Sequence, residues 1–134
     1  MNYQEYKGYS PEELLRLYES VGWSNYTRRP KMLRQAYAHS LFILAAYENE
    51  TLVGIIRLVG DGASILYVQD LLVHPDFQRR GIGGELLRRA LAQFPQVYQS
   101  VLLTDDTLKS RAFYQAMGLT DAAAIGCRAF LRMQ

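Results

Sequence analysis

The chain has 134 residues, of which 49% are apolar and 21% charged, and its formal net charge at pH 7 is +2. This length suits one domain with its own hydrophobic core, so we expect a single domain over residues 1–134. The single cysteine excludes an intramolecular disulfide, and no run approaches the roughly 18 apolar residues of a membrane-spanning helix. The first residues do not read as a signal peptide, so the sequence predicts a cytoplasmic protein without a membrane partner.

A net charge of +2 is too small to indicate nucleic acid as the partner. Positive charge does concentrate locally, at Arg28-Arg29, Arg79-Arg80 and Arg88-Arg89. Such pairs of arginines usually lie on a solvated face and bind nothing. If they did bind nucleic acid, the affinity for DNA would depend strongly on salt concentration. We therefore expect no nucleic-acid partner. The two histidines have no metal-ligand spacing, so we expect no metal site.

Hydrophobic periodicity divides the chain into elements, and prolines and glycines mark their boundaries. Alternating apolar residues favour strands, while apolar residues three and four apart favour helices. In chain order, the sequence predicts an edge strand at 3–6, a helix from Pro11 to Gly22, a helix at 30–39, strands at 41–47, 51–58 and 64–73, a helix at 82–94, a strand at 97–104, a helix at 108–117, and one or two final strands.

The first helix has clear boundary signals. Ser10 and Glu13 fit a capping box around Pro11, and Gly22 fits a helix end. After it, Gly22–Tyr26 is predicted to be a loop that carries two large aromatic residues.

The middle of the chain predicts the architecture. A strand at 64–73, a glycine-rich turn, a helix at 82–94 and a strand at 97–104 form a crossover between parallel strands. The preceding hairpins are antiparallel. We therefore expect an α/β (α+β) fold, with a mixed, mostly antiparallel sheet and helices on both faces.

The turn before residue 82 is the most informative segment. Gly81, Gly83 and Gly84 let a ligand approach the backbone, because no Cβ atom is in the way. The first amides of a helix have no internal partner, and the helix dipole favours negative charge there. Arg79 and Arg80 add positive charge beside it. These features predict a phosphate-binding turn.

Two common phosphate motifs do not match this turn. A Walker loop needs Gly-Lys followed by Ser or Thr, which is absent. The dinucleotide fingerprint needs a glycine where the chain has Leu86, and it follows a first parallel strand rather than antiparallel hairpins. The residues therefore predict a diphosphate site of another kind.

Gln78–Gly83 matches a motif of the GNAT superfamily, Gln/Arg-x-x-Gly-x-Gly/Ala. The chain thus resembles this superfamily, whose members are acetyl-CoA-dependent N-acetyltransferases. Asp70–Pro75 is similar to the apolar strand and His-Pro exit that precede this motif in the family. Ala112–Leu119 resembles the family's second motif, a helix in which Phe-Tyr runs into Gly-Leu. The resemblance extends from the first helix to about Leu119.

The resemblance implies that coenzyme A, as acetyl-CoA, is the cofactor. It implies that the two parallel strands splay apart, that the thioester sits in the gap, and that an N–H near Val73 faces the thioester oxygen. Thr107 stands where the family often has an asparagine that reaches the cofactor. The cofactor-binding residues are then Leu72, Val73, Gln78, Arg79, Arg80, Gly81, Ile82, Gly83, Gly84 and Thr107.

Two residues are candidates for catalysis. The resemblance places Tyr114 beside the sulfur as the acid for the leaving thiolate; the alternative is a core aromatic residue. Asp70 can take a proton from the substrate ammonium or hold that cation; the alternative is an ion pair with Arg57. Asp105 and Asp106 can serve the same cleft or cap the next helix.

The acceptor pocket is the least specified part of the site. Trp23, Tyr26 and Tyr67 are its candidates, and the alternative for each is an ordinary core position. They favour a flat or apolar amine. Cys127 has no basic neighbour in the sequence, so we expect a small core residue rather than a nucleophile.

The leading functional hypothesis is an N-acetyltransferase that acts by direct attack in a ternary complex, on a small-molecule or peptide amine. The alternative is a non-catalytic acyl-CoA-binding or regulatory module. The sequence leaves open a homodimer, which is frequent in the family.

Overall fold

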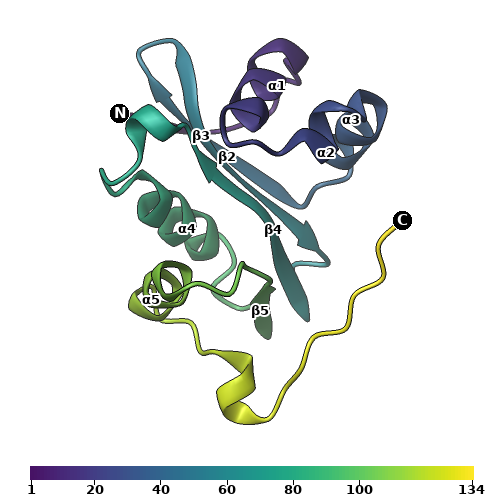
Figure 1. Ribbon diagram of the computed structural model, residues 1–134, viewed down its shortest axis with the longest axis vertical. Coiled ribbons are helices and arrows are strands. Elements are labelled where there is room, and N and C mark those ends of the chain that lie inside the picture. The colour runs from purple at the N-terminus through teal and green to yellow at the C-terminus, as the bar shows by residue number, and fades with distance from the viewer. The chain divides into compact units, whose positions relative to one another are not determined.

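The computed structural model describes residues 1–134, which form two compact units, residues 1–103 and 104–134. The first unit contains a five-stranded sheet of order β1-β2-β3-β4-β5 (Figure 1). All neighbouring strands are antiparallel except β4 and β5, which are parallel. This confirms the predicted mixed sheet. The strands are β1 (Asn2–Glu5), β2 (Phe42–Glu48), β3 (Thr51–Gly60), β4 (Ile65–Val73) and β5 (Gln99–Leu102).

Helices cover both faces of this sheet, as predicted (Figure 1). They are α1 (Pro11–Ser20), α2 (Ser24–Thr27), α3 (Pro30–Ala38) and α4 (Ile82–Ala92). On one face, apolar side chains of α1 and α3 form a buried cluster with the strands: Leu14, Leu17, Leu33, Ile43, Ala45, Ile55 and Leu72. On the other face, α4 packs through Ile82, Leu86, Leu87 and Ala90, which are all buried. No helix of the chain has both the length and the apolar character needed to cross a membrane.

Gly54 of β3 allows α4 to lie close to the sheet. A Cβ atom at this position would lie 3.2 Å from Leu86 Cδ1 and 3.3 Å from Ile82 Cγ2. Because these atoms belong to the first turns of α4, a larger residue would push the start of that helix away.

We expect Gly54→Val to lower the free energy of unfolding by about 1–3 kcal/mol, the usual effect of an overpacked core. Urea denaturation of the two proteins measures the difference. Gly8→Val is the matched control, since a Cβ atom at Gly8 meets nothing within 4 Å. Equal losses in the two variants would contradict this packing argument.

A β-bulge at Gln69 changes the face to which β4 directs its side chains. Arg57 of β3 pairs with Asp70, but the next residue, Leu58, pairs with Val68, which leaves Gln69 as the extra residue. Cross-strand partners share a face, so Asp70 points toward α1 and α3, while Val68 points toward α4.

The parallel strands separate immediately after this bulge. β5 pairs with β4 only from Ile65 to Val68. From Asp70 to Val73, β4 still pairs with β3 but pairs with no strand on its other side. The main chain of β4 is therefore open along half of its length.

The second unit contains α5 (Leu108–Ala116) and a 3-10 helix, η2 (Ala122–Ile125). The predicted final strands are wrong: Asp121 caps η2, Gly126 ends it at a φ of 84°, and residues 127–134 form neither helix nor strand. The alanine run of η2 favours a helical turn over a strand. Cys127 is exposed, so its predicted core position is also wrong.

Two local predictions near the N-terminus need correction. Ser10 occupies the N-cap of α1, but its side chain makes no capping hydrogen bond. Glu13 instead accepts hydrogen bonds from the hydroxyls of Tyr6 (3.1 Å) and Tyr47 (3.2 Å), so it does not close a capping box. The predicted loop at 22–26 contains the start of the short helix α2, while the remaining predicted helices and strands occur where expected.

Candidate active site

The loop between β4 and α4 is braced against the end of β4. It contains one turn of 3-10 helix, η1 (Pro75–Phe77). His74 Nδ1 accepts a hydrogen bond from the Asp76 amide at 3.1 Å. Gln78 Nε2 donates to the carbonyl oxygen of Val73 at 2.9 Å. The glutamine of the predicted motif therefore fixes the loop to the strand.

Two residues of this loop have a left-handed backbone conformation. Arg79 has a φ of 65°, which is uncommon for a residue other than glycine, and Gly81 has a φ of 81°. Gly81 is the N-cap of α4 and has open space where a Cβ would lie. Turns of this kind direct successive N–H groups to one side and form anion-binding concavities.

Six successive backbone amides, those of residues 79–84, donate no hydrogen bond within the chain. The first amide of α4 that does is that of Glu85, which donates to the Gly81 carbonyl oxygen at 3.0 Å. These unpaired amides lie at the positive end of the α4 dipole. All the residues of the predicted diphosphate-binding segment thus present free donors together, and the buried side chain of Ile82 anchors the segment to the core.

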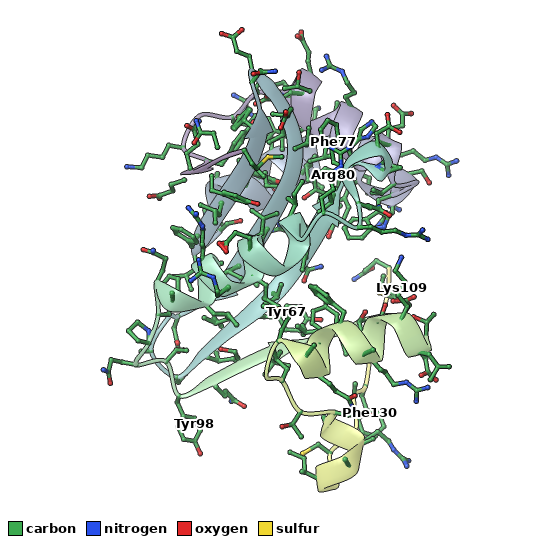
Figure 2. All side chains as sticks on the ribbon, turned by 90° about the vertical axis from the view of Figure 1, so that its left-hand side faces the viewer. Tyr67, Phe77, Arg80, Tyr98, Lys109 and Phe130 are labelled. Atoms are coloured by element: carbon green, nitrogen blue, oxygen red, sulfur yellow. The ribbon has the colours of Figure 1, made fainter.

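The charges beside these amides are positive. Arg79 and Arg80 are exposed, and the Arg80 guanidinium lies over the Phe77 ring, 5.0 Å from its centroid (Figure 2). The Glu85 carboxylate forms ion pairs with Arg88 (Nη2 to Oε2, 2.7 Å) and Arg89 (Nε to Oε2, 3.1 Å). The hydrogen bonds from these two arginines lower the pKa of Glu85 to about 2. Its carboxylate is therefore neutralised by its neighbours and does not oppose an anion.

The open edge of β4 leads directly into the start of this loop. The His74 amide donates to the Val53 carbonyl oxygen of β3 at 2.8 Å. Because successive residues of a strand direct their amides to opposite sides, the Val73 amide points to the open edge. Leu72 has a buried side chain in the core, so only its main chain is available to a ligand.

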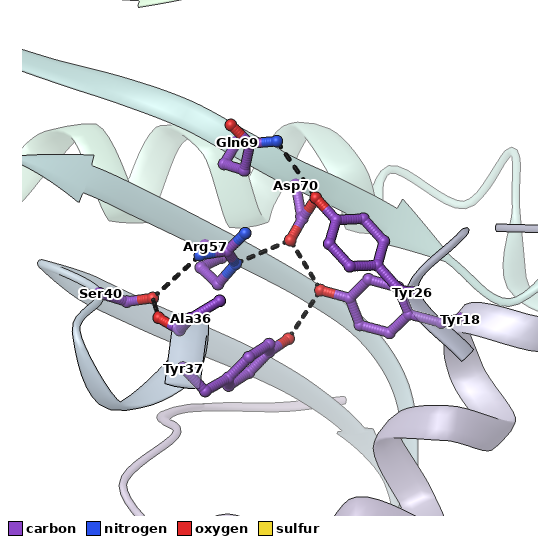
Figure 3. Close-up of polar contacts among 8 residues, drawn as sticks. All are labelled: Tyr18, Tyr26, Ala36, Tyr37, Ser40, Arg57, Gln69 and Asp70. Carbon is purple, nitrogen blue, oxygen red and sulfur yellow. Dashed lines mark hydrogen bonds and ion pairs between the residues drawn. The ribbon is translucent and has the colours of Figure 1, made fainter. Parts of the chain in front are cut away.

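Asp70 lies in a buried polar network (Figure 3). Its Oδ2 accepts hydrogen bonds from Arg57 Nε at 2.7 Å and from the Tyr18 hydroxyl at 2.8 Å. The side chains of Asp70 and Arg57 are 1% and 4% exposed, and the Tyr18 hydroxyl also contacts that of Tyr37 at 2.8 Å. Burial alone would lower the pKa of Arg57, but the Asp70 carboxylate raises it. Of the two predicted roles for Asp70, the geometry favours the ion pair.

We expect Asp70→Asn to lower the free energy of unfolding by about 3–5 kcal/mol, because it leaves the buried Arg57 guanidinium without its counter-charge. Urea denaturation measures this loss. Asp76→Asn is the control, since the Asp76 side chain is 82% exposed and its change should be close to zero. Unchanged stability together with lost turnover would instead indicate that Asp70 is the base.

Trp23 and Tyr26 form an aromatic wall beside this network. Their ring centroids lie 6.0 Å and 5.1 Å from that of the buried Tyr18. The Tyr26 hydroxyl accepts a hydrogen bond from Gln69 Nε2 at 3.1 Å, and burial raises the pKa of Tyr26. This hydrogen bond joins the aromatic wall to Gln69 of β4, which directly follows Val68, the last residue of β4 that pairs with β5.

The third acceptor candidate is not part of this wall. No hydrogen bond or ring contact joins Tyr67 to Trp23 or Tyr26. Sequence reasoning also missed Gln69, because only the pairing register shows that it is a bulge residue.

Tyr114 lies in α5 of the second unit. It is half-buried, and its ring packs edge-on against Phe113 with 4.9 Å between centroids. Burial raises the pKa of Tyr114, and the charge of Asp105 raises it further. The phenol is therefore protonated at neutral pH and can act as a proton donor.

Thr107 and Asp105 organise the start of α5. Thr107 Oγ1 accepts a hydrogen bond from the Ser110 amide at 3.1 Å, so Thr107 is the N-cap. Asp105 Oδ1 accepts from the Ser110 hydroxyl at 2.6 Å. Asp105 therefore braces the first turn of α5 through the Ser110 side chain, while the cap predicted for Asp105 or Asp106 is made by Thr107.

The chain matches a known sequence family over most of its length. The sequence profile described as the Acetyltransferase (GNAT) family matches residues 7–119. The chain belongs to the GNAT family. The matched region contains both the glycine-rich motif and the Phe-Tyr motif. The mixed sheet with one parallel pair of strands is the GNAT fold.

Individual GNAT proteins resemble the chain to different extents. An uncharacterized N-acetyltransferase of Prochlorococcus marinus is 32% identical over 115 residues, which are 81% of this chain and 61% of that protein. The chain thus spans about three fifths of the length of the curated relatives that it matches. A GNAT-family acetyltransferase from Streptococcus pneumoniae is 40% identical, with a TM-score of 0.91 over 99% of this chain and 97% of that one.

A more distant GNAT structure contains coenzyme A. The PaiA N-acetyltransferase from Thermoplasma acidophilum, solved in complex with coenzyme A, has a TM-score of 0.66 and 18% identity, over 87% of this chain and 88% of that one. At this identity the comparison shows a shared fold.

Proposed function

We propose that this chain is an N-acetyltransferase that transfers an acetyl group from acetyl-CoA to a primary amine of a small molecule or peptide, by direct attack in a ternary complex. The observation that supports this function best is the run of unpaired amides at residues 79–84. Membership of the GNAT family supports the same reaction class.

The residues at the start of α4 suit the diphosphate of coenzyme A. Free N–H groups at a helix N-terminus bind phosphate oxygens, and Arg79 and Arg80 add positive charge beside them. The open edge of β4 at Leu72 and Val73 offers main-chain partners to the amides of a pantetheine arm. When bound, acetyl-CoA supplies an activated acetyl thioester.

Two groups of the chain have the chemistry that acyl transfer needs. The Val73 amide points to the open edge of β4, and an N–H there stabilises the negative charge that develops on a carbonyl oxygen. Burial raises the pKa of Tyr114, so the phenol keeps its proton at neutral pH and can donate it to the thiolate as the thiolate leaves.

Trp23 and Tyr26 are the proposed acceptor wall. Flat aromatic faces favour an amine with an apolar or aromatic body, and they also attract its cationic form before it loses a proton. Asp70 supports this wall through Tyr18 rather than contacting the amine. We therefore assign Asp70 a positioning role.

Release of free thiol from acetyl-CoA, measured with a panel of primary amines, tests this function. We expect release that depends on the amine and is fastest with aromatic or apolar amines. Tight binding of coenzyme A without release for any amine would indicate a non-catalytic binding module instead.

A further inference from the structure

Positive charge gathers on α2 and α3 without any negative charge beside it in the sequence. Residues 20–47 contain no aspartate or glutamate. Four exposed basic side chains of this stretch form what we call the basic surface: Arg28, Arg29, Lys31 and Arg34. None of the four lies within ion-pair distance of a carboxylate, whereas Arg57, Arg88 and Arg89 all do. The charge of the basic surface is therefore available to a partner.

The basic surface adjoins the aromatic wall formed by Trp23 and Tyr26. The Arg29 amide donates a hydrogen bond to the Tyr26 carbonyl oxygen at 3.0 Å, so a tight turn holds Arg28 and Arg29 next to the wall. Consecutive Cα atoms are about 3.8 Å apart, which puts the Arg28 Cα within about 8 Å of the Tyr26 Cα. The Debye length at physiological salt is also about 8 Å, so a negative group beside the wall is attracted by this charge.

The charge extends further than a single carboxylate can reach. Arg29 Nη1 donates to the Asn25 carbonyl oxygen of α2 at 3.2 Å. Arg34 lies further along α3, with its guanidinium 5.2 Å from the centroid of the Tyr9 ring, and Lys31 lies one turn before it. A helix of the nine residues of α3 is about 13 Å long. An extended peptide advances about 3.3 Å per residue, so about four residues are needed to follow it.

We propose that the basic surface selects acidic peptides as acceptors, with the primary amine of the peptide at the aromatic wall and its carboxylates along α2 and α3. This inference rests on the proposed acetyl transfer and names the acceptor class. The amine nitrogen takes the acetyl group and loses a proton, and coenzyme A leaves as the thiol. A peptide carries an amine and several carboxylates on one extended chain, and the small net charge of +2 does not favour nucleic acid.

Thiol release from acetyl-CoA, measured with matched peptides, tests this selection. Each peptide has one primary amine, on an N-terminal phenylalanine, followed by four glutamates, four glutamines or four arginines. Exposed ion pairs each contribute modestly, so kcat/KM for the glutamate peptide should exceed that for the glutamine peptide by about tenfold at low salt, with the arginine peptide slowest. This advantage should shrink as the salt concentration rises and should grow as the number of glutamates increases from one to four.

Arg28→Gln and Lys31→Gln locate the recognition. Each variant should lower the ratio of the glutamate rate to the glutamine rate by about threefold, because each removes one exposed ion pair. The circular dichroism spectrum should stay the same. Arg88→Gln is the matched control, since Arg88 is also exposed (62%) but lies on α4, on the opposite face of the sheet from α3 (Figure 1). Its ratio should equal that of the wild type.

Binding of the glutamate peptide, labelled at its C-terminus and measured by fluorescence anisotropy in the presence of coenzyme A, separates this selection from the acetyl transfer itself. Salt-dependent binding without thiol release would overturn the acetyl transfer. Equal release with all three peptides would overturn only the selection of acidic acceptors. Neither binding nor release would overturn both.

Three further results would overturn the selection. One glutamate could give the whole advantage, which would indicate a small-molecule acid. Arg88→Gln could lose as much of the advantage as Arg28→Gln. A single-stranded RNA of equal charge could bind more tightly than the peptide and lose this affinity in Arg28→Gln, which would assign the basic surface to nucleic acid.

Discussion

Replacing Gly83 with glutamate is expected to abolish coenzyme A binding while the protein stays folded. The new carboxylate would lie among the unpaired amides of residues 79–84. Two like charges about 4 Å apart near a protein surface repel by on the order of 4 kcal/mol. That corresponds to about a thousandfold weaker binding, which isothermal titration with coenzyme A can measure.

Folding of the Gly83→Glu variant should not suffer. A negative charge in the first turn of a helix interacts favourably with the helix dipole, and glutamate is a better helix former than glycine. The thermal midpoint should thus be unchanged or slightly higher. Gly83→Gln has a similar bulk without the charge, so it should bind coenzyme A more tightly than Gly83→Glu does. Wild-type affinity in Gly83→Glu would show that the diphosphate binds elsewhere.

Tyr114→Phe is expected to reduce turnover by at least about 100-fold, the usual contribution of a positioned acid, with little change in coenzyme A affinity. The variant removes only the hydroxyl, so the half-buried ring and its contact with Phe113 remain. Steady-state kinetics together with titration of coenzyme A separate the two effects. Equal losses in turnover and affinity would contradict the acid role.

The pH dependence of the wild type gives a second check on Tyr114. Because burial raises the pKa of Tyr114 above its ordinary value, the acid form persists through neutral and mildly alkaline pH. The rate should therefore rise with pH as the amine loses its proton, without a decline from this residue below about pH 10. Tyr9→Phe, in which no hydrogen-bonded hydroxyl is lost, should leave both the rate and this profile unchanged.

Local signals in the sequence predicted most of the fold. The hairpins follow from alternating apolar residues that are interrupted by turns, and the crossover follows from a glycine-rich turn before a helical period. The segment around Gly81 was predicted for the same reason: glycine spacing and adjacent arginines are local features, and the structure shows the free amides that they imply.

Long-range contacts explain what the sequence left open. Whether Asp70 is a base or an ion-pair partner depends on Arg57, which faces it from the next strand, and on Tyr18, which comes from α1. The bulge at Gln69 exists only as a pairing register between strands. The predicted final strands do not form: a strand also needs a neighbour to pair with, and residues 127–134 are neither helix nor strand.

Isothermal titration of the full chain with coenzyme A tests most directly whether residues 79–84 hold a diphosphate. We predict saturable heat of binding and a rise in the thermal midpoint, both lost in Gly83→Glu. No heat and no thermal protection at a high concentration of coenzyme A would contradict the assignment of these amides, and the proposed acetyl transfer with it.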